Sequence, residues 1–238
     1  ICMVSVTLLV FDGLDPNLLD RYIDQASLPN FEKMRRDNRL KTMMSTVPAI
    51  TSPAAFCLYT GCNPGRNGPT QWVKSDGETP YGREDLQVEA VWDYLDREDI
   101  PFYVYNARFT GPPPEKGEAF VSSLPSDAYP SSLNQKLEVE MSGIEKDNPS
   151  VEDVDSLAEK DSKNVELLEE DTNAEFRLIY IGFTDTMQHG GWNKDDVKKR
   201  TYEKADDLLG EFQDLSDHTV VASDHGFHSN PEMRVHIN

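Results

Sequence analysis

The chain has 238 residues, which is long enough to bury one substantial hydrophobic core. It is strongly acidic, since 43 Asp and Glu residues outnumber 23 Lys and Arg residues and give a net charge of −20. A surface of this charge repels nucleic-acid phosphates and anionic lipids, so the composition argues against binding to nucleic-acid polymers or to membranes. An acidic excess spread over the whole chain is also typical of salt-adapted proteins, and we interpret it as halophilic.

The cysteines and the first residues bear on the cellular compartment. Cys2, Cys57 and Cys62 are odd in number and show no paired spacing, so we expect no disulfide framework and a reducing compartment. Residues 1–11 are apolar, but they lack the basic start and the small-residue cleavage site of a signal peptide. No apolar run approaches the roughly 20 residues of a membrane span. These features predict a cytoplasmic protein, and they leave its oligomeric state open.

The first part of the chain predicts two strands and two helices. Residues 4–11 form a continuous apolar run rich in β-branched side chains, which is typical of a strand covered on both faces in a parallel sheet. Helices are predicted at residues 15–22 and 28–35, where a proline stands close to each start. Residues 40–45 are a plausible second strand.

The segment from residue 47 to 68 predicts a short helix with a hydroxyl group at its start. Thr51 and Ser52 stand where a helix N-cap belongs, and Pro53 fits the first turn. Thr51 would then lie at the positive end of the helix, beside free backbone N–H groups that suit a phosphate. Taken alone, the segment is better explained as an ordinary capped helix.

The middle of the chain is less regular. A helix is predicted over residues 88–95 and a strand over residues 102–105, whereas residues 107–132 are proline-rich and expected to be irregular. Residues 137–171 are the most acidic stretch, and their apolar side chains recur at helical spacing, which predicts an amphipathic helix. We interpret residues 107–173 as a peripheral or lid-like region.

The last third predicts two further buried strands, at residues 177–183 and 218–223, with a long amphipathic helix at residues 195–215 between them. Strands that alternate with helices favour an α/β fold, a three-layer sandwich with a mostly parallel central sheet.

Three of the predicted strands are followed by a carboxylate, namely Asp12, Asp185 and Asp224. Because the carboxyl ends of parallel strands lie along one edge of the sheet, these side chains should converge. His189 lies one helical turn after Asp185, and His225 follows Asp224 directly. Carboxylates and imidazoles at such spacing suit Zn²⁺ or a similar divalent cation. Each piece alone could be a turn or a helix cap, but together with Thr51 they favour a metal site.

Four motifs occur in an order that resembles the alkaline phosphatase superfamily. They are Val-Phe-Asp-Gly, Thr-Ser-Pro-Ala followed by Thr-Gly-Cys-Asn-Pro-Gly-Arg-Asn-Gly, Thr-Asp-Thr-Met-Gln-His, and Ser-Asp-His-Gly-Phe. The pattern is most similar to the type I phosphodiesterase/nucleotide pyrophosphatase branch. The resemblance implies an alkaline-phosphatase-like core in a single catalytic domain over residues 1–238, and it is weakest between residues 116 and 173.

The resemblance also implies an activity and a site. The protein would be a phosphoric ester hydrolase that acts on a small phosphodiester or phosphomonoester with two divalent metal ions, zinc or else manganese or magnesium. Thr51 would be the nucleophile, and a phosphothreonine would form and then be hydrolysed by water. One ion would be held by Asp12, Thr51, Asp224 and His225 (the Asp12 position), and the other by Asp185 and His189 (the Asp185 position).

The Asp185 position has no matched third protein ligand. The family usually supplies a histidine from a segment well after the Asp-His-Gly motif, and His228 and His236 are the remaining histidines in that direction. We therefore expect the native protein to continue beyond Asn238 or to lack an ordered tail there. We also expect the metal at the Asp185 position to be the more weakly held of the two.

Other functions remain open at this stage. The chain could belong to another phosphoryl-transfer branch, such as a phosphomutase or a phosphoethanolamine transferase, or it could be a non-catalytic metal-binding or interaction protein that keeps the fold. Residues 62–66 match the Cys-x-Pro-x-Arg motif of sulfatases, but here the motif follows Thr60-Gly61 instead of preceding it. Cys62 is therefore misplaced for a sulfatase nucleophile.

Overall fold

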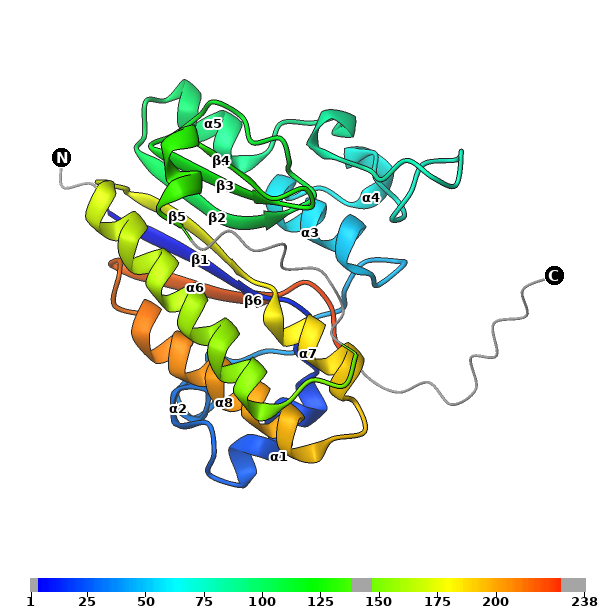
Figure 1. Ribbon diagram of the computed structural model, residues 1–238, viewed down its shortest axis with the longest axis vertical. Coiled ribbons are helices and arrows are strands. Elements are labelled where there is room, and N and C mark those ends of the chain that lie inside the picture. Colours follow the sequence, from blue (N-terminus) through cyan, green and yellow to red (C-terminus); the bar gives the residue numbers. More distant parts are fainter. Residues whose placement is uncertain (1–3, 138–146, 228–238) are drawn as a thin grey trace.

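The computed structural model describes residues 4–137 and 147–227 (Figure 1). Six strands form one sheet in these residues, and all neighbouring strands are parallel except the last two on one side. The strands are β1 (Val6–Phe11), β2 (Phe102–Arg108), β3 (Ala119–Ser123), β4 (Asp127–Tyr129), β5 (Phe176–Ile181) and β6 (His218–Ser223).

The strand order is β4-β3-β2-β5-β1-β6, which places β1 between two strands that come much later in the chain. Val6 of β1 is paired with Phe176 of β5 and with His218 of β6. β4 is antiparallel to β3. The mostly parallel sheet of the sequence analysis is confirmed.

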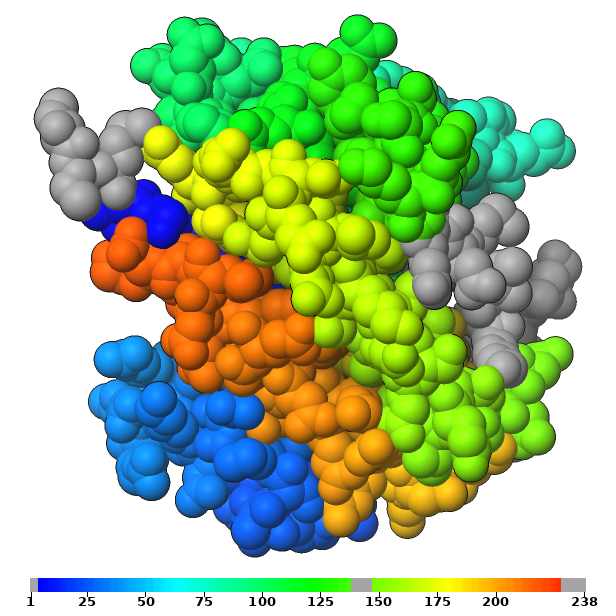
Figure 2. Space-filling view, turned by 60° about the vertical axis from the view of Figure 1, so that its left-hand side comes forward, coloured from blue at the N-terminus to red at the C-terminus, as the bar shows by residue number. Residues whose placement is uncertain are grey.

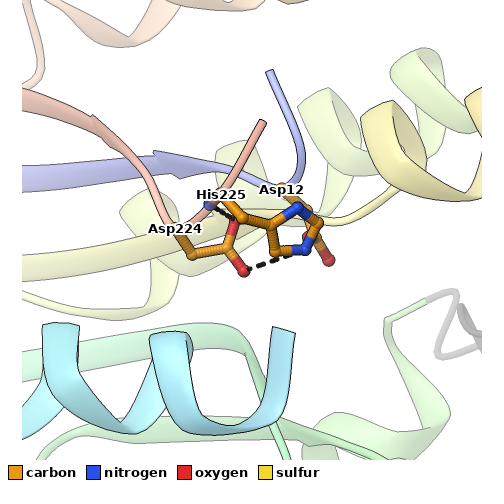
Figure 3. Close-up of side chains that lie close together, drawn as sticks. All are labelled: Asp12, Asp224 and His225. Atoms are coloured by element: carbon orange, nitrogen blue, oxygen red, sulfur yellow. Dashed lines mark hydrogen bonds and ion pairs between the residues drawn. The ribbon is translucent and has the colours of Figure 1, made fainter. Parts of the chain in front are cut away.

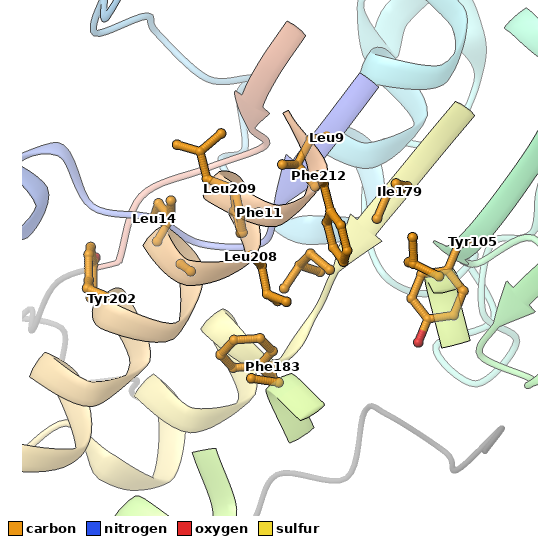
Figure 4. Packing of buried hydrophobic residues seen from close by; sticks show 14 of the residues in the cluster. Leu9, Phe11, Leu14, Tyr105, Ile179, Phe183, Tyr202, Leu208, Leu209 and Phe212 are labelled. Atoms are coloured by element: carbon orange, nitrogen blue, oxygen red, sulfur yellow. The ribbon is translucent and has the colours of Figure 1, made fainter. Parts of the chain in front are cut away.

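The central strands β1, β2 and β5 are buried on both faces, which explains their continuous apolar runs. The prediction that residues 218–223 form a buried strand is wrong as to burial, because β6 is an edge strand and none of its residues is buried. Leu9 and Phe11 belong to one hydrophobic cluster, whereas Val10 between them belongs to a second cluster on the opposite face. Figure 4 shows Phe183 and Phe212, from two different helices, packed with Leu9 and Phe11 in the first cluster. Each such side chain contributes roughly 1.5–3 kcal/mol when fully buried.

Helices cover the two faces unequally, as Figure 1 shows. The first cluster is covered by α1 (Pro16–Asp24), α2 (Pro29–Arg36), α6 (Val151–Asp171), α7 (Phe183–Gly191) and α8 (Asp195–Phe212). The second is covered by α3 (Thr51–Thr60) and α5 (Val91–Arg97). Short turns of helix complete the set, namely α4 (Pro64–Asn67), η1 (Arg83–Asp85) and η2 (Ser131–Gln135). None of the helices in the described ranges is long and apolar enough to cross a membrane.

The region of residues 107–173 differs from the expectation of a peripheral cover. It supplies β3 and β4, which were not predicted because their segment is rich in proline. It also supplies the predicted amphipathic helix, which is α6. Val154 and Leu168 of α6 are fully buried in the same cluster as β1. α6 and α8 lie side by side at the surface (Figure 2), where Arg200 donates a hydrogen bond to Asp155. In its described part, the region supplies strands of the central sheet and one helix of the layer that covers it.

The strand predicted at residues 40–45 is absent from the structure, where these residues are irregular. Met43 and Met44 are 86% and 92% exposed. The prediction was wrong because a run of strand-forming residues becomes a strand only when its backbone pairs with a neighbour. None of the six described strands pairs with this segment.

Candidate active site

Two buried carboxylates and one imidazole meet where β1 and β6 end. Asp12 follows β1 directly, and Asp224 and His225 follow β6. One ligand atom of each lies within 4.8 Å of the others, and Figure 3 shows the His225 ring beside both carboxylates. The backbone N–H of Gly13 donates a hydrogen bond to Asp224 Oδ1 (3.1 Å), which ties the turn after β1 to the end of β6. The structure thus brings three of the predicted site residues together.

The hydrogen bonds of His225 fix which of its ring nitrogens carries a proton. Nδ1 lies 2.8 Å from the carbonyl oxygen of Gly226, and because a carbonyl can only accept, Nδ1 must be the protonated nitrogen. In the neutral imidazole, Nε2 then keeps its lone pair. It lies 2.9 Å from Thr51 Oγ1 and 3.4 Å from Asp12 Oδ1. A lone pair held in this direction is what a metal ligand requires.

Thr51 is the first residue of α3. The expectation that Thr51 or Ser52 would cap this helix is wrong, because Ile50 is the N-cap residue and no side chain caps the helix. Both hydroxyl groups are engaged elsewhere, since Thr51 contacts His225 and Ser52 donates to the carbonyl of Gln71 (3.0 Å). The first N–H groups of α3 consequently have no partner within the helix, and they lie beside the Thr51 hydroxyl.

The second pair of predicted ligands lies on α7. Asp185 is in its first turn and His189 in its last, and His189 Nε2 lies 3.3 Å from Asp185 Oδ2. A Cβ atom at Gly13 would lie 3.0 Å from Asp185 Oδ1, so the turn after Asp12 packs directly against this carboxylate. Within the described part of the chain, no third carboxylate, imidazole or thiolate joins this pair in a cluster. The other candidate ligands, His228 and His236, lie outside the described residues.

Arg108 is a site residue that the sequence analysis did not place. Its side chain is 3% exposed, with Nε 3.3 Å from Asp12 Oδ2, and its Nη2 donates to the carbonyl of Gly182 (3.2 Å). Burial raises the pKa of Asp12 well above its usual range, and the Asp224 carboxylate raises it further, whereas Arg108 opposes the shift. The predicted strand ended at Tyr105, but β2 continues to Arg108.

Comparisons with known proteins decide the family. A profile of the type I phosphodiesterase/nucleotide pyrophosphatase family matches residues 6–238. The chain belongs to this family. The resemblance found in the four motifs is thereby confirmed. Among curated protein sequences, none matches the chain.

Solved structures show the fold that this phosphodiesterase-family chain shares. Phosphonoacetate hydrolase from Sinorhizobium meliloti 1021, in complex with phosphonoformate, superposes with a TM-score of 0.65 at 18% sequence identity, covering 94% of this chain and 56% of the hydrolase. Murine ectonucleotide pyrophosphatase/phosphodiesterase 5 superposes with a TM-score of 0.57 at 16% identity, covering 93% of this chain and 57% of the murine protein. The chain therefore spans little more than half the length of either relative.

Three further side chains form hydrogen bonds that hold the residues of the family's motifs in place. Tyr180 donates a hydrogen bond to Asp224 Oδ2 (2.9 Å), and burial raises its pKa well above the ordinary value, so it stays a neutral donor. Thr184 donates to the carbonyl of Asp12 (2.6 Å), and Gln188 donates to that of Gly13 (2.9 Å). Sequence reasoning did not assign these hydrogen bonds. Neither a buried tyrosine in a strand nor a polar residue in a helix indicates which distant residue it bonds to.

The donor set of this phosphodiesterase-family site fits a divalent cation. Asp12 Oδ1 and Asp185 Oδ1 are buried oxygens that accept no hydrogen bond from the described residues. A buried carboxylate oxygen without a partner is costly unless a cation satisfies it. Carboxylate oxygens together with a deprotonated imidazole nitrogen are ligands that zinc accepts. Of the two free oxygens, that of Asp12 belongs to a group that could hold a metal ion, together with Asp224 and His225.

The cysteine of the sulfatase-like motif lies at the wrong end of the helix. Thr51 begins α3, whereas Cys62 follows Gly61, the residue that ends it in a left-handed conformation. Ten helical residues span about 15 Å, so Cys62 is remote from the Asp12 position. Cys57 and Cys62 are both free thiols, and Cys2 lies outside the described residues.

Proposed function

We propose that the chain is a metal-dependent hydrolase of small phosphate esters, with Thr51 as its nucleophile. The observation that carries this proposal is the position of Thr51 Oγ1, 2.9 Å from His225 Nε2 at the start of α3. Nε2 also lies 3.4 Å from the free oxygen of Asp12. Family membership supports the reaction class.

The residues that would hold the metal ions follow from the two positions. Divalent cations, when bound, would offset the negative charge of the phosphoryl oxygens and favour the deprotonated form of the attacking hydroxyl. At the Asp185 position the ligands would be Asp185 and His189. At the Asp12 position the ligands would be Asp12, Thr51, Asp224 and His225.

The chain's own groups would orient the attack on phosphorus. His225 Nε2 lies 2.9 Å from Thr51 Oγ1 and would hold the hydroxyl group at the start of α3, where it can face the substrate. The Oγ1–phosphorus bond would form as the bond from phosphorus to the leaving alcohol breaks, and solvent would take up the hydroxyl proton and protonate the alcohol. Water would then cleave the phosphothreonine. The free N–H groups of Thr51 and Ser52 would donate to phosphoryl oxygens throughout.

Two relatives support a small phosphorus-containing substrate. The phosphonoacetate hydrolase holds phosphonoacetate in one structure and phosphonoformate in another. The murine phosphodiesterase is described as inactive when one threonine is replaced by alanine, and that variant binds AMP. All three ligands carry a tetrahedral phosphorus centre with negative oxygens, as the proposed substrate of this chain would.

A hydrolysis assay tests the proposal. The protein is loaded in turn with Zn²⁺, Mn²⁺ and Mg²⁺ and given bis(4-nitrophenyl) phosphate or 4-nitrophenyl phosphate. Thr51→Ala should lower turnover at least about a thousandfold, whereas Thr51→Ser should keep part of it. Thr60→Ala is the matched control, because Thr60 ends the same helix and bonds only within that region.

The outcomes separate the proposal from its alternatives. Wild-type turnover by Thr51→Ala would exclude Thr51 as the nucleophile. A wild-type protein that binds metal but leaves every phosphate ester intact would favour a non-catalytic metal-binding protein. A phosphoryl adduct on Thr51, found by mass spectrometry after rapid acid quench, would support the covalent step.

A further inference from the structure

Arg108 is a buried cation within a cluster of carboxylates. Its Nε lies 3.3 Å from Asp12 Oδ2, and its guanidinium also interacts electrostatically with Asp185. Asp224 in turn interacts with Asp12. Three carboxylates in one buried place repel one another, and their charges are costly unless a cation offsets them.

The local backbone is shaped to bring Arg108 to this place. The register of β2 against β3 shifts between Val104 and Ala107, and Asn106 has a positive φ of 58°. Such a bulge changes the direction of the side chains that follow it. Gly182 leaves the space that the guanidinium occupies, because a Cβ atom there would collide with Nη2. The site is therefore built around the arginine.

The two oxygens of Asp12 have different surroundings, because only one of them contacts Arg108. Oδ2 contacts Arg108, whereas Oδ1 accepts no hydrogen bond in the described structure and lies 3.4 Å from His225 Nε2. An arginine guanidinium is not deprotonated in proteins, and here it is paired with the Asp12 carboxylate. The guanidinium consequently stays charged, and Asp12 presents one free oxygen to the Asp12 position.

We propose that Arg108 is a resident counter-cation that holds the carboxylate cluster together before a metal ion binds and leaves Asp12 Oδ1 free for that ion. It is a positioning residue, since it acts through Asp12. The inference rests on the proposed function in one respect, namely that the Asp12 position binds a divalent cation.

The consequence is a coupling between Arg108 and the metal. In the metal-free protein Arg108 is the cation that offsets the cluster, whereas in the loaded protein the metal shares this role. Removing the arginine charge should therefore destabilise the metal-free protein more than the loaded one. If a substitution lowers the free energy of unfolding more in the metal-free state than in the loaded state, the folded variant must bind the metal more tightly than the wild type does.

Unfolding curves with and without metal test this coupling. Wild type and Arg108→Met are melted in excess EDTA and in saturating Zn²⁺, and zinc affinity is measured by calorimetry. The loss in melting temperature should be at least about twice as large in EDTA as in Zn²⁺, and zinc should bind roughly tenfold more tightly to the variant. Arg108→Lys, which keeps the charge, should restore most of the loss in EDTA.

Arg177→Met is the matched control. Arg177 is a buried arginine near the opposite end of β5, and it donates to both oxygens of Glu169 (2.6 and 2.9 Å). Its loss should lower the melting temperature equally in EDTA and in Zn²⁺, because no metal position lies near it.

The outcomes distinguish a failure of the role of Arg108 from a failure of the proposed function. Equal losses for Arg108→Met in both conditions would overturn the role of Arg108 and leave the proposed function standing. A variant that folds only with Zn²⁺ would support it. If Arg108→Met folds in neither condition, Arg108→Lys decides. Melting close to wild type in both conditions, or a larger loss in EDTA than in Zn²⁺, supports the role of the charge, whereas an equally large loss in both conditions overturns it. Wild-type protein that gains nothing from any metal would overturn both proposals.

Discussion

The two metal positions differ in how the chain builds them. The Asp12 position combines the ends of β1 and β6 with the start of α3, and each of its side chains is buried. The Asp185 position uses two residues of one helix, and the His189 side chain is 42% exposed. The first position exists only in the complete fold and is shielded from water, whereas the second is local and open. A ligand set fixed by three segments should bind its ion more firmly than a pair on one helix.

The largest expected effect comes from Asp224→Asn. Asp224 accepts hydrogen bonds from Gly13 N–H and from the Tyr180 hydroxyl, so an amide NH₂ group at that place would face a donor. We expect turnover of bis(4-nitrophenyl) phosphate to fall about a thousandfold or more, with loss of the ion at the Asp12 position. Asp217→Asn, at the other end of β6, is the control. Normal metal content and turnover in Asp224→Asn would contradict this view of the position.

The histidines should separate the two positions by affinity. His225→Ala should weaken the tighter of two zinc-binding events by about 10–100-fold, because it removes a buried nitrogen ligand. His189→Ala should leave that event unchanged and remove only the weaker one. Titration calorimetry with metal analysis measures both. Two ions of equal affinity in the wild type would show that local and distributed ligand sets do not differ here.

A buried carboxylate outside both positions provides a metal-independent reference. Burial raises the pKa of Asp161 on α6 to about 6, although Lys160 and the Tyr105 hydroxyl oppose the shift. Because this pKa lies above that of the unfolded chain, the folded state binds the proton more tightly. The contribution is fully present below about pH 4 and is lost as pH rises through about 6.

Asp161→Asn should therefore remove part of the pH dependence of stability. Between pH 5 and pH 8, the free energy of unfolding of the wild type should fall by roughly 1–2 kcal/mol more than that of the variant. Urea unfolding at both pH values measures this difference. It should be the same with EDTA as with Zn²⁺. Parallel pH profiles of wild type and variant would show that Asp161 is ionised in the folded protein at pH 5.

The smallest expected effect concerns Gly13, which lies between the two positions. Gly13 has a φ of +68°, and an alanine Cβ would come within 3.0 Å of Asp185 Oδ1. Gly13→Ala should cost about 1 kcal/mol of stability and weaken the ion at the Asp185 position. Gly77→Ala is the control, because Gly77 has a φ of +77° and no atom within reach of a Cβ. Equal metal binding by the two variants would contradict the contact.

The sequence predicted the carboxylates that follow directly on β1 and β6, although only β1 of these two strands is buried. Asp12 and Asp224 end continuous apolar runs, and parallel pairing of β1 with β6 brings such ends to one edge. This argument needs only the hydrophobic pattern and the fold class. The placing of Asp185 in the first turn of α7, four residues beyond the last residue of β5, needed the structure.

Arg108 escaped prediction for a physical reason. Its position depends on the bulge in β2 and on the space left at Gly182, a residue that is distant in the chain. A single arginine in a proline-rich segment indicates neither the bulge nor the space at Gly182. β3 and β4 were missed for a related reason, because short strands are stabilised by pairing with their neighbours rather than by their own composition.

The place of β1 in the sheet bears on how the molecule forms during translation. β1 is the first of the six described strands to be synthesised, yet its partners begin at Phe176 and His218. At 5–20 residues per second, the chain would wait roughly 10–45 s between the appearance of Asp12 and that of His225. The apolar β1 segment has neither sheet partner until β5 has been made, which is most of that time. Such distant pairing is slow and leaves nascent chains open to aggregation, so early capture by a chaperone would favour a high yield of folded protein.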